Sequence, residues 1–172
     1  EQADEVQWYR RRLPGVPVLA GADRAASGRR ALAAGADVLV MDDGFQHLRL
    51  WRDLDIVLLD AVSPWGGGRT LPAGLLREFP KSLAAADVFC LTRCDQAGAA
   101  AEKLAAELAA RWPGRPILRS RHAPARLTEL SGQNRELAEL RGRRVWAFAG
   151  IGRPAAFGRT LAELGAEVAE LT

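Results

Sequence analysis

Short apolar runs recur along the chain and alternate with segments whose apolar residues are spaced as in a helix. The runs lie at residues 16–20, 37–41, 55–60, 87–92, 116–118 and 144–150. Helical patterns fill residues 22–34 and 96–112, and Pro113 and Gly114 end the second. Runs rich in Val, Ile and Leu that alternate with helices are typical of a parallel sheet with helices on both faces. The pattern therefore predicts an α/β fold.

The pattern loosens between residues 119 and 143. This stretch holds Pro, Gly, Ser and many charges, with one short helix expected at 133–141. Such a composition is typical of a connection between domains. We therefore predict a core domain over residues 1–118, a linker over 119–143 and the start of a smaller α/β domain over 144–172.

Composition narrows the class of protein. The 172 residues are 48% hydrophobic, which suits one globular domain or one domain and part of a second. The net charge is +3 and the pI is near 9.4, but the basic residues are scattered rather than gathered in a stripe with aromatic residues. We therefore expect no nucleic-acid partner, and we interpret Arg10–Arg12 as the solvated face of a helix.

Neither a membrane span nor a structural metal site is indicated. No apolar run approaches the roughly 18 residues that cross a bilayer, so we expect this segment to be soluble. Cys90 and Cys94 are the only cysteines, and they lack the further ligands that a structural zinc ion requires. We expect both thiols to be reduced.

The candidate chemistry begins at the stretch VLVMDDGFQHLRL, residues 38–50. Asp42 and Asp43 follow the apolar run at 37–41, and Asp60 and Thr92 end two later runs. Ligands bind beyond the carboxyl ends of parallel strands, and carboxylate oxygens there are typical Mg²⁺ ligands in phosphoryl-transfer enzymes. Gly44 would allow the backbone to turn so that both acids reach one site. The alternative is that Asp42 caps the following turn and that Asp43 is solvated.

A second candidate segment covers residues 60–80, DAVSPWGGGRTLPAGLLREFP. Three consecutive glycines and Arg69 predict a mobile loop that can approach a polyanion closely. Arg77 and Glu78 follow, in a segment that we expect to be a short helix. The alternative is a flexible surface loop with a solvated ion pair.

Three long motifs together identify a resemblance. They are DDGFQHLRLWRDLDIVLLDA, GGGRTLPAGLLRE and FAGIGRPAAFGRTLAELGAE. In this order and spacing they resemble the tetraacyldisaccharide 4'-kinase family, the lipid A kinases of Gram-negative bacteria. The resemblance implies a P-loop NTPase-like core that a two-stranded linker joins to a smaller α/β domain.

The resemblance also implies an activity. The family transfers the γ-phosphate of ATP, with Mg²⁺, to the 4'-hydroxyl of a tetraacylated disaccharide 1-phosphate, a lipid A precursor. It works at the cytoplasmic face of the inner membrane as a peripheral protein. For this chain we expect the same lipid substrate and a monomer.

Matching positions receive the family's site roles. Asp42 and Asp43 match the acidic pair that handles metal and nucleotide, and we also expect Asp43 to be catalytic. Gln46 and His47 match the nucleotide-site residues beyond the pair. Arg77 matches an arginine near the phosphates, and Glu78 a carboxylate near the metal. Asp4, in ADEV, aligns with the family's catalytic aspartate, although Ala3 and Val6 replace a glycine and a proline of the family motif. Arg24 matches a phosphate-facing arginine.

The sequence contains no G-x-x-x-x-G-K-[ST] phosphate loop. In the family this loop lies upstream of the ADEV match, and a membrane-associating helix lies further upstream. We therefore expect an interior piece of such a kinase, with little or no activity alone and with its membrane contact made by other parts.

Three alternatives stay open. LTRCDQ, residues 91–96, loosely resembles the guanine-reading loop of a GTPase-like switch protein, with Thr92 and Asp95 in place but Arg93 where a lysine is expected. AGIGRP, residues 149–154, has part of a dinucleotide fingerprint, although the pattern favours a tight strand-to-helix turn. The third alternative is a non-catalytic binding module.

Overall fold

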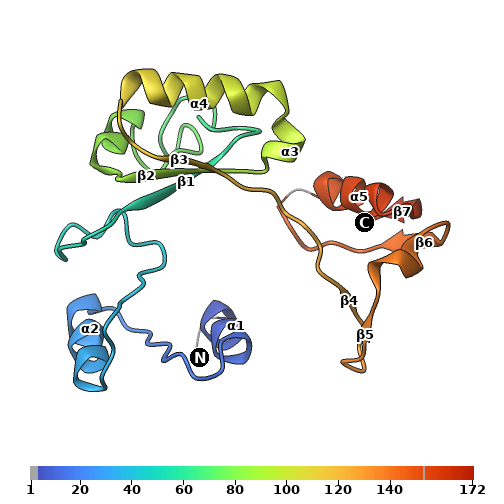
Figure 1. The fold of residues 1–172 in the computed structure, drawn as a ribbon, viewed down its shortest axis with the longest axis horizontal. Coiled ribbons are helices and arrows are strands. Elements are labelled where there is room, and N and C mark those ends of the chain that lie inside the picture. The colour runs from blue at the N-terminus through green and yellow to red at the C-terminus, as the bar shows by residue number, and fades with distance from the viewer. Residues whose placement is uncertain (1–3, 153) are drawn as a thin grey trace. The chain divides into compact units, whose positions relative to one another are not determined.

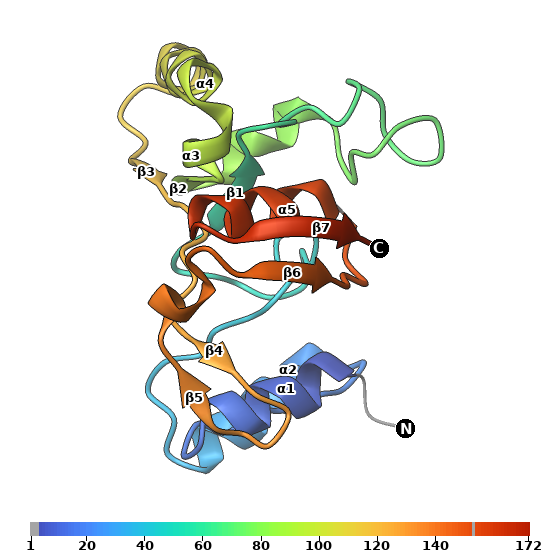
Figure 2. The ribbon, with the colours of Figure 1, turned by 90° about the vertical axis from the view of Figure 1, so that its right-hand side faces the viewer.

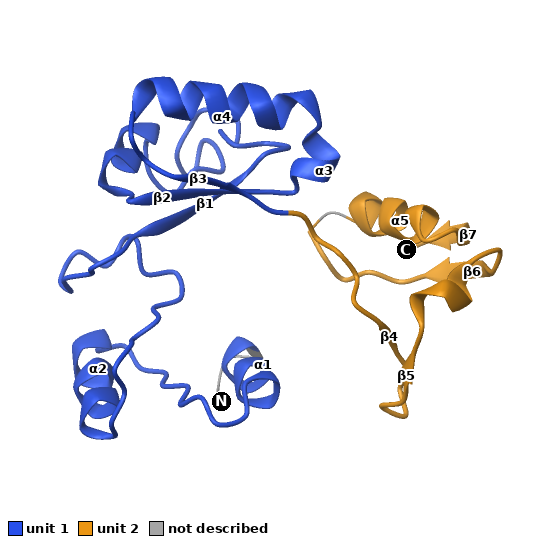
Figure 3. Cartoon of the chain, in the orientation of Figure 1, with its two compact units in different colours: residues 1–120 blue, residues 121–172 orange. Residues whose placement is uncertain are grey.

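The computed structural model describes residues 4–152 and 154–172 of the chain. The chain is divided into two compact units, residues 1–120 and residues 121–172 (Figure 3). Each unit has its own apolar core. The assignment of residues 119–143 as a linker stays a prediction.

A three-stranded parallel sheet forms the centre of the first unit. Its strands are β1 (Ile56–Asp60), β2 (Val88–Thr92) and β3 (Ile117–Arg119), in the order β1-β2-β3. Asp60 lies opposite Thr92 at the carboxyl edge. These strands confirm the predictions at 55–60, 87–92 and 116–118, and with them the parallel α/β fold.

Helices α3 (Cys94–Ala97) and α4 (Ala99–Arg111) follow β2, and α4 runs over one face of the sheet (Figure 1). The predicted helix at 96–112 is thus confirmed, with a break at Gly98, whose φ of 52° no ordinary helical residue adopts. Phe89 and Leu91 of β2 are fully buried together with Leu108 of α4. The 3-10 helix η1 (Pro80–Ala85) adds Leu83 to this core.

Two further helices precede the sheet in sequence. They are α1 (Asp4–Arg12) and α2 (Arg24–Ala33), the second confirming the helix predicted at 22–34. The backbone N–H of Ala26 donates to Oδ1 of Asp23 at 2.9 Å, an N-cap that lowers the pKa of the Asp23 carboxyl. Arg10, Arg11 and Arg12 are exposed on α1, as the sequence predicts.

The predicted strands at residues 16–20 and 37–41 are wrong for this structure. Neither segment pairs with another strand in the described residues, and the side chains of Val38 and Val40 are 78% and 93% exposed. An apolar run becomes a strand only when a neighbour accepts its backbone hydrogen bonds, because a lone extended segment is not stable. Asp42 and Asp43 therefore do not end a buried strand here.

The second unit combines a hairpin with a parallel pair of strands. The hairpin joins β4 (Leu127–Thr128) and β5 (Asn134–Arg135), and η2 (Leu137–Leu140) replaces most of the helix expected at 133–141. Strands β6 (Arg144–Ala147) and β7 (Glu167–Leu171) lie side by side with α5 (Pro154–Glu163) against them (Figure 2). The run predicted at 144–150 is thus confirmed as β6, and α5 and β7 follow it.

None of the helices within residues 4–152 and 154–172 has the length and apolar character to cross a membrane.

Candidate functional site

The acidic loop, defined as residues 42–50, is a series of tight turns. The backbone N–H of His47 donates to the carbonyl oxygen of Gly44 at 2.9 Å, and Phe45 packs against the core of the first unit. The residue of the loop with left-handed backbone is Asp43, with φ of 52°. Gly44 instead allows close packing, because a Cβ there would lie 2.7 Å from Cε of Met41. The loop thus presents two exposed carboxylates from an anchored base.

Asp43 is joined to Arg77, which comes from the second motif. Nη1 of Arg77 donates to Oδ1 of Asp43 at 2.5 Å and also contacts Oδ2, and this ion pair raises the pKa of Arg77. Both side chains are more than half exposed, so the pair adds little to stability. Its significance is positional, since it brings together residues 34 apart in the sequence.

Asp42 has a different partner, the phenol of Tyr9 on α1. The hydroxyl of Tyr9 donates to Oδ2 of Asp42 at 3.2 Å, and this hydrogen bond raises the pKa of Tyr9. Tyr9 is not among the residues predicted from the sequence, because a lone tyrosine on an exposed helix carries no signature of such a contact.

The glycine-rich loop places Arg77. Gly66, Gly67 and Gly68 all have positive φ, at 47°, 83° and 75°, where residues with a Cβ are strained. Further along, Thr70 and Leu76 form an isolated bridge. The short helix predicted around Arg77 and Glu78 is wrong, because Pro80 disfavours helical backbone at Phe79 and itself begins η1.

We expect Gly67→Ala to destabilise the conformation of this glycine-rich loop. No atom lies within 4 Å of a Cβ built there, so the cost is backbone strain, about 1–2 kcal/mol for a left-handed residue with a side chain. Such strain would lower the occupancy of the loop conformation roughly tenfold. The matched control is Gly150→Ala, which has equal space and no positive φ. Thermal unfolding of both variants measures the loss of stability. Equal losses of stability for Gly67→Ala and Gly150→Ala would contradict the prediction.

The other predicted site residues are not gathered at the Asp43–Arg77 pair by any contact that the structure shows. Glu78 is half-buried beside Arg77, Gln46 is exposed, and His47 is half-buried within the acidic loop. Arg24 is exposed at the start of α2, and Asp4 begins α1, with a side chain outside the described residues. Within residues 4–152 and 154–172, no three His, Cys, Asp or Glu side chains come close enough to hold a metal ion.

The donor chemistry of the acidic loop nevertheless suits Mg²⁺. This ion is commonly held by one or two carboxylates, while substrate phosphates and waters complete its shell. Asp42 and Asp43 supply carboxylates on an exposed turn, and both could exchange their present partners for a cation. The residues therefore fit the ion, with Glu78 next to Arg77 as the further predicted ligand.

The carboxyl edge of the sheet carries an ion pair that is not predicted from the sequence either. Arg93, in the left-handed conformation with φ of 56°, pairs with Asp60 at the end of β1. The Arg93 side chain is only 13% exposed. Because Asp60 engages this guanidinium, the segment LTRCDQ, residues 91–96, does not present Arg93 for stacking on a nucleotide base.

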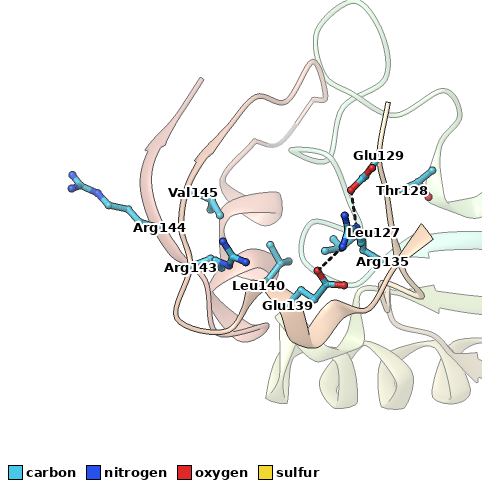
Figure 4. A pocket seen from close by; sticks show the side chains of 9 residues that line it. All are labelled: Leu127, Thr128, Glu129, Arg135, Glu139, Leu140, Arg143, Arg144 and Val145. Atoms are coloured by element: carbon cyan, nitrogen blue, oxygen red, sulfur yellow. Dashed lines mark hydrogen bonds and ion pairs between the residues drawn. The ribbon is translucent and has the colours of Figure 1, made fainter. Parts of the chain in front are cut away.

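The second unit contains a shallow hollow of about 490 Å³, lined by Leu127, Thr128, Glu129, Arg135, Glu139, Leu140, Arg143, Arg144 and Val145 (Figure 4). Arg135 lies between two carboxylates, with Nε 2.7 Å from Glu129 and Nη1 3.6 Å from Glu139. Its charge is thus compensated within the unit. None of the predicted site residues lines this hollow.

Comparisons with known proteins relate these features to a family. The model of the family described as tetraacyldisaccharide-1-P 4'-kinase matches residues 1–172. A tetraacyldisaccharide 4'-kinase of Anaeromyxobacter dehalogenans (strain 2CP-C) is 51% identical over 98% of the chain and 45% of its own length. One of Syntrophus aciditrophicus (strain SB) is 44% identical over 99% of the chain and 48% of its own length.

A solved structure is also similar. It is a crystal structure of LpxK from Aquifex aeolicus, described as an "apo" form in complex with ATP. The TM-score is 0.61 and the identity 32%, over 88% of this chain and 44% of the other. The chain thus spans about half the length of the curated relatives it matches.

Proposed function

We propose a function from one established premise: this chain belongs to the tetraacyldisaccharide-1-P 4'-kinase family. The gene product would transfer the γ-phosphate of ATP to the 4'-hydroxyl of a tetraacylated disaccharide 1-phosphate. The observation that carries the proposal is the meeting of Asp43 and Arg77. They come from two separate family motifs, and they place a carboxylate and a guanidinium together on an exposed surface.

The roles of the residues follow from charge. Arg77 would move from Asp43 to an oxygen of the transferred phosphate, since a planar guanidinium binds phosphate as well as carboxylate. Asp42 and Asp43, with Glu78, would then hold Mg²⁺, which supplies charge neutralisation for the phosphates when bound. Gln46, His47 and Arg24 would contact the nucleotide or its phosphates.

Asp4 would act as the general base. Its carboxylate would accept the proton of the 4'-hydroxyl as that oxygen bonds to the γ-phosphorus, and the bond to ADP would break. The family resemblance of ADEV supports this role. We further propose that the gene product is a monomer that works at the cytoplasmic face of the inner membrane and meets the membrane through parts outside this segment.

The test is phosphate transfer by the full-length gene product. With ATP carrying a labelled γ-phosphate, Mg²⁺ and the disaccharide lipid, we expect label at the 4'-position. The matched control is an acceptor whose 4'-hydroxyl already carries phosphate, which should take up no label. Removing divalent cations with a chelator should abolish transfer. Absence of transfer to the first acceptor, or a preference for GTP over ATP, would contradict the proposal.

The 172-residue segment alone should behave differently. It contains no G-x-x-x-x-G-K-[ST] loop, so backbone N–H groups and a lysine for the β- and γ-phosphates are missing from it. Because phosphoryl transfer depends on positioning and charge neutralisation together, we expect turnover at least about 1,000-fold below that of the full-length gene product. Comparable turnover by the segment would show that this view of the phosphate site is wrong.

A further inference from the structure

The side chain of Arg52 is joined to the acidic loop through backbone carbonyls. Its Nη1 donates to the carbonyl oxygen of His47 at 2.8 Å and to that of Leu50 at 3.3 Å. Its Nη2 lies 3.5 Å from the carbonyl oxygen of Phe45. One guanidinium thus contacts the loop at three points, all on the carboxyl side of Asp42 and Asp43.

A carboxylate holds this guanidinium in place. Nε of Arg52 donates to Oδ1 of Asp55 at 2.6 Å, and the two side chains are only 18% and 15% exposed. Such a pair is partly shielded from water, so breaking it costs more than breaking the exposed Asp43–Arg77 pair. Arg52 is therefore the better fixed of the two arginines.

Asp55 in turn belongs to the amino edge of the sheet. Its backbone N–H donates to Oδ2 of Asp87 at 2.8 Å, and its carbonyl oxygen accepts from the N–H groups of Asp87 and Val88. Arg115, just before β3, donates to Oδ1 of Asp87 at 3.1 Å. A continuous chain of polar contacts thus runs from the starts of β2 and β3, through Asp55, to Arg52 and the loop.

We propose that Arg52 is a positioning residue of the site, which clamps the acidic loop to the sheet. It touches no predicted site side chain, and it acts on the backbone that carries Asp42, Asp43 and His47. The inference rests on the proposed function for its effect on catalysis, but the clamp itself is a property of the fold. The planar fork of arginine is essential, because a lysine has one nitrogen and cannot reach several carbonyls and Asp55 at once.

Two measurements on the full-length gene product test the clamp. The variants are Arg52→Lys and Arg52→Gln, and the control is Arg49→Gln, which removes an exposed arginine of the same loop. We expect both Arg52 variants to lower kcat at least tenfold and to raise the Mg²⁺ concentration for half-maximal rate, with Arg49→Gln unchanged. Circular dichroism should show all three folded.

Hydrogen exchange provides a readout that needs no activity. We expect the amides of His47, Leu48 and Leu50 to exchange at least tenfold faster in Arg52→Gln than in Arg49→Gln, while those of β2 stay protected. Unchanged exchange in the loop would overturn the clamp, as would a kcat and Mg²⁺ dependence like those of the control. If the unaltered gene product transfers no phosphate, the proposed function fails, and the exchange rates still decide the clamp.

Discussion

Replacing Asp42 and Asp43 together by Asn is expected to lower the kcat of the full-length gene product at least about 100-fold. Loss of one charged or hydrogen-bonding group that stabilises a transition state costs about this much, and here two carboxylates are removed from the proposed Mg²⁺ site. Asparagine keeps the shape of aspartate and tolerates the left-handed backbone that Asp43 adopts, with φ of 52°. The loop should therefore keep its conformation while its charge is lost.

Steady-state kinetics over a range of Mg²⁺ concentrations provide the measurement. As a single variant, Asp43→Asn should also cut turnover strongly, because it removes a carboxylate of the proposed Mg²⁺ site. Asp95→Asn is the matched control, since it removes an exposed carboxylate of α3, next to β2. We expect that control to stay near normal turnover. A double variant that runs at the normal rate would end the idea that these acids hold the metal.

The sequence predicts the strands that pair with each other inside the chain. The runs at 55–60, 87–92 and 116–118 form β1, β2 and β3, because each finds a neighbour for its backbone and a buried side for residues such as Phe89 and Leu91. The run at 37–41 is similarly apolar but has no paired neighbour in the described residues. Composition reports the tendency to form a strand, whereas pairing decides whether one forms.

The site is predicted in part, and the reason differs from residue to residue. The motifs single out Asp43 and Arg77, but no spacing rule links residues 34 apart, so only the structure shows that they meet. The contacts of Arg52 cannot be predicted from the sequence, since an arginine that contacts backbone carbonyls can face almost any residue type. Contacts to backbone leave little trace in residue identity. Tyr9 cannot be predicted for another reason: its hydroxyl donates to the Asp42 side chain, and a single tyrosine on a helix carries no sequence signature of such a contact.

The second large effect concerns stability, and Phe89→Ala is the variant. Phe89 is fully buried in β2, and its ring lies 5.6 Å from that of Trp112 at an angle of 52°. Removing a buried phenyl ring costs its transfer free energy and leaves a cavity, together about 3–5 kcal/mol. Much of a typical domain's free energy of unfolding, about 5–15 kcal/mol, would thus be lost.

Urea unfolding of the full-length gene product, followed by tryptophan fluorescence and circular dichroism, measures this loss. Trp112 reports on the core of the first unit, because it packs directly against Phe89. Phe148→Ala is the matched control, since the same ring is removed from a residue that is 75% exposed, and its cost should stay within about 0.5 kcal/mol. Similar losses for both variants would contradict the packing of β2 beneath α4. The packing of α4 on β2 also fixes β1, the neighbour of β2. Asp55 lies at the amino edge of β1 and holds Arg52, which contacts the acidic loop. Loss of this packing should therefore also raise hydrogen exchange in the acidic loop.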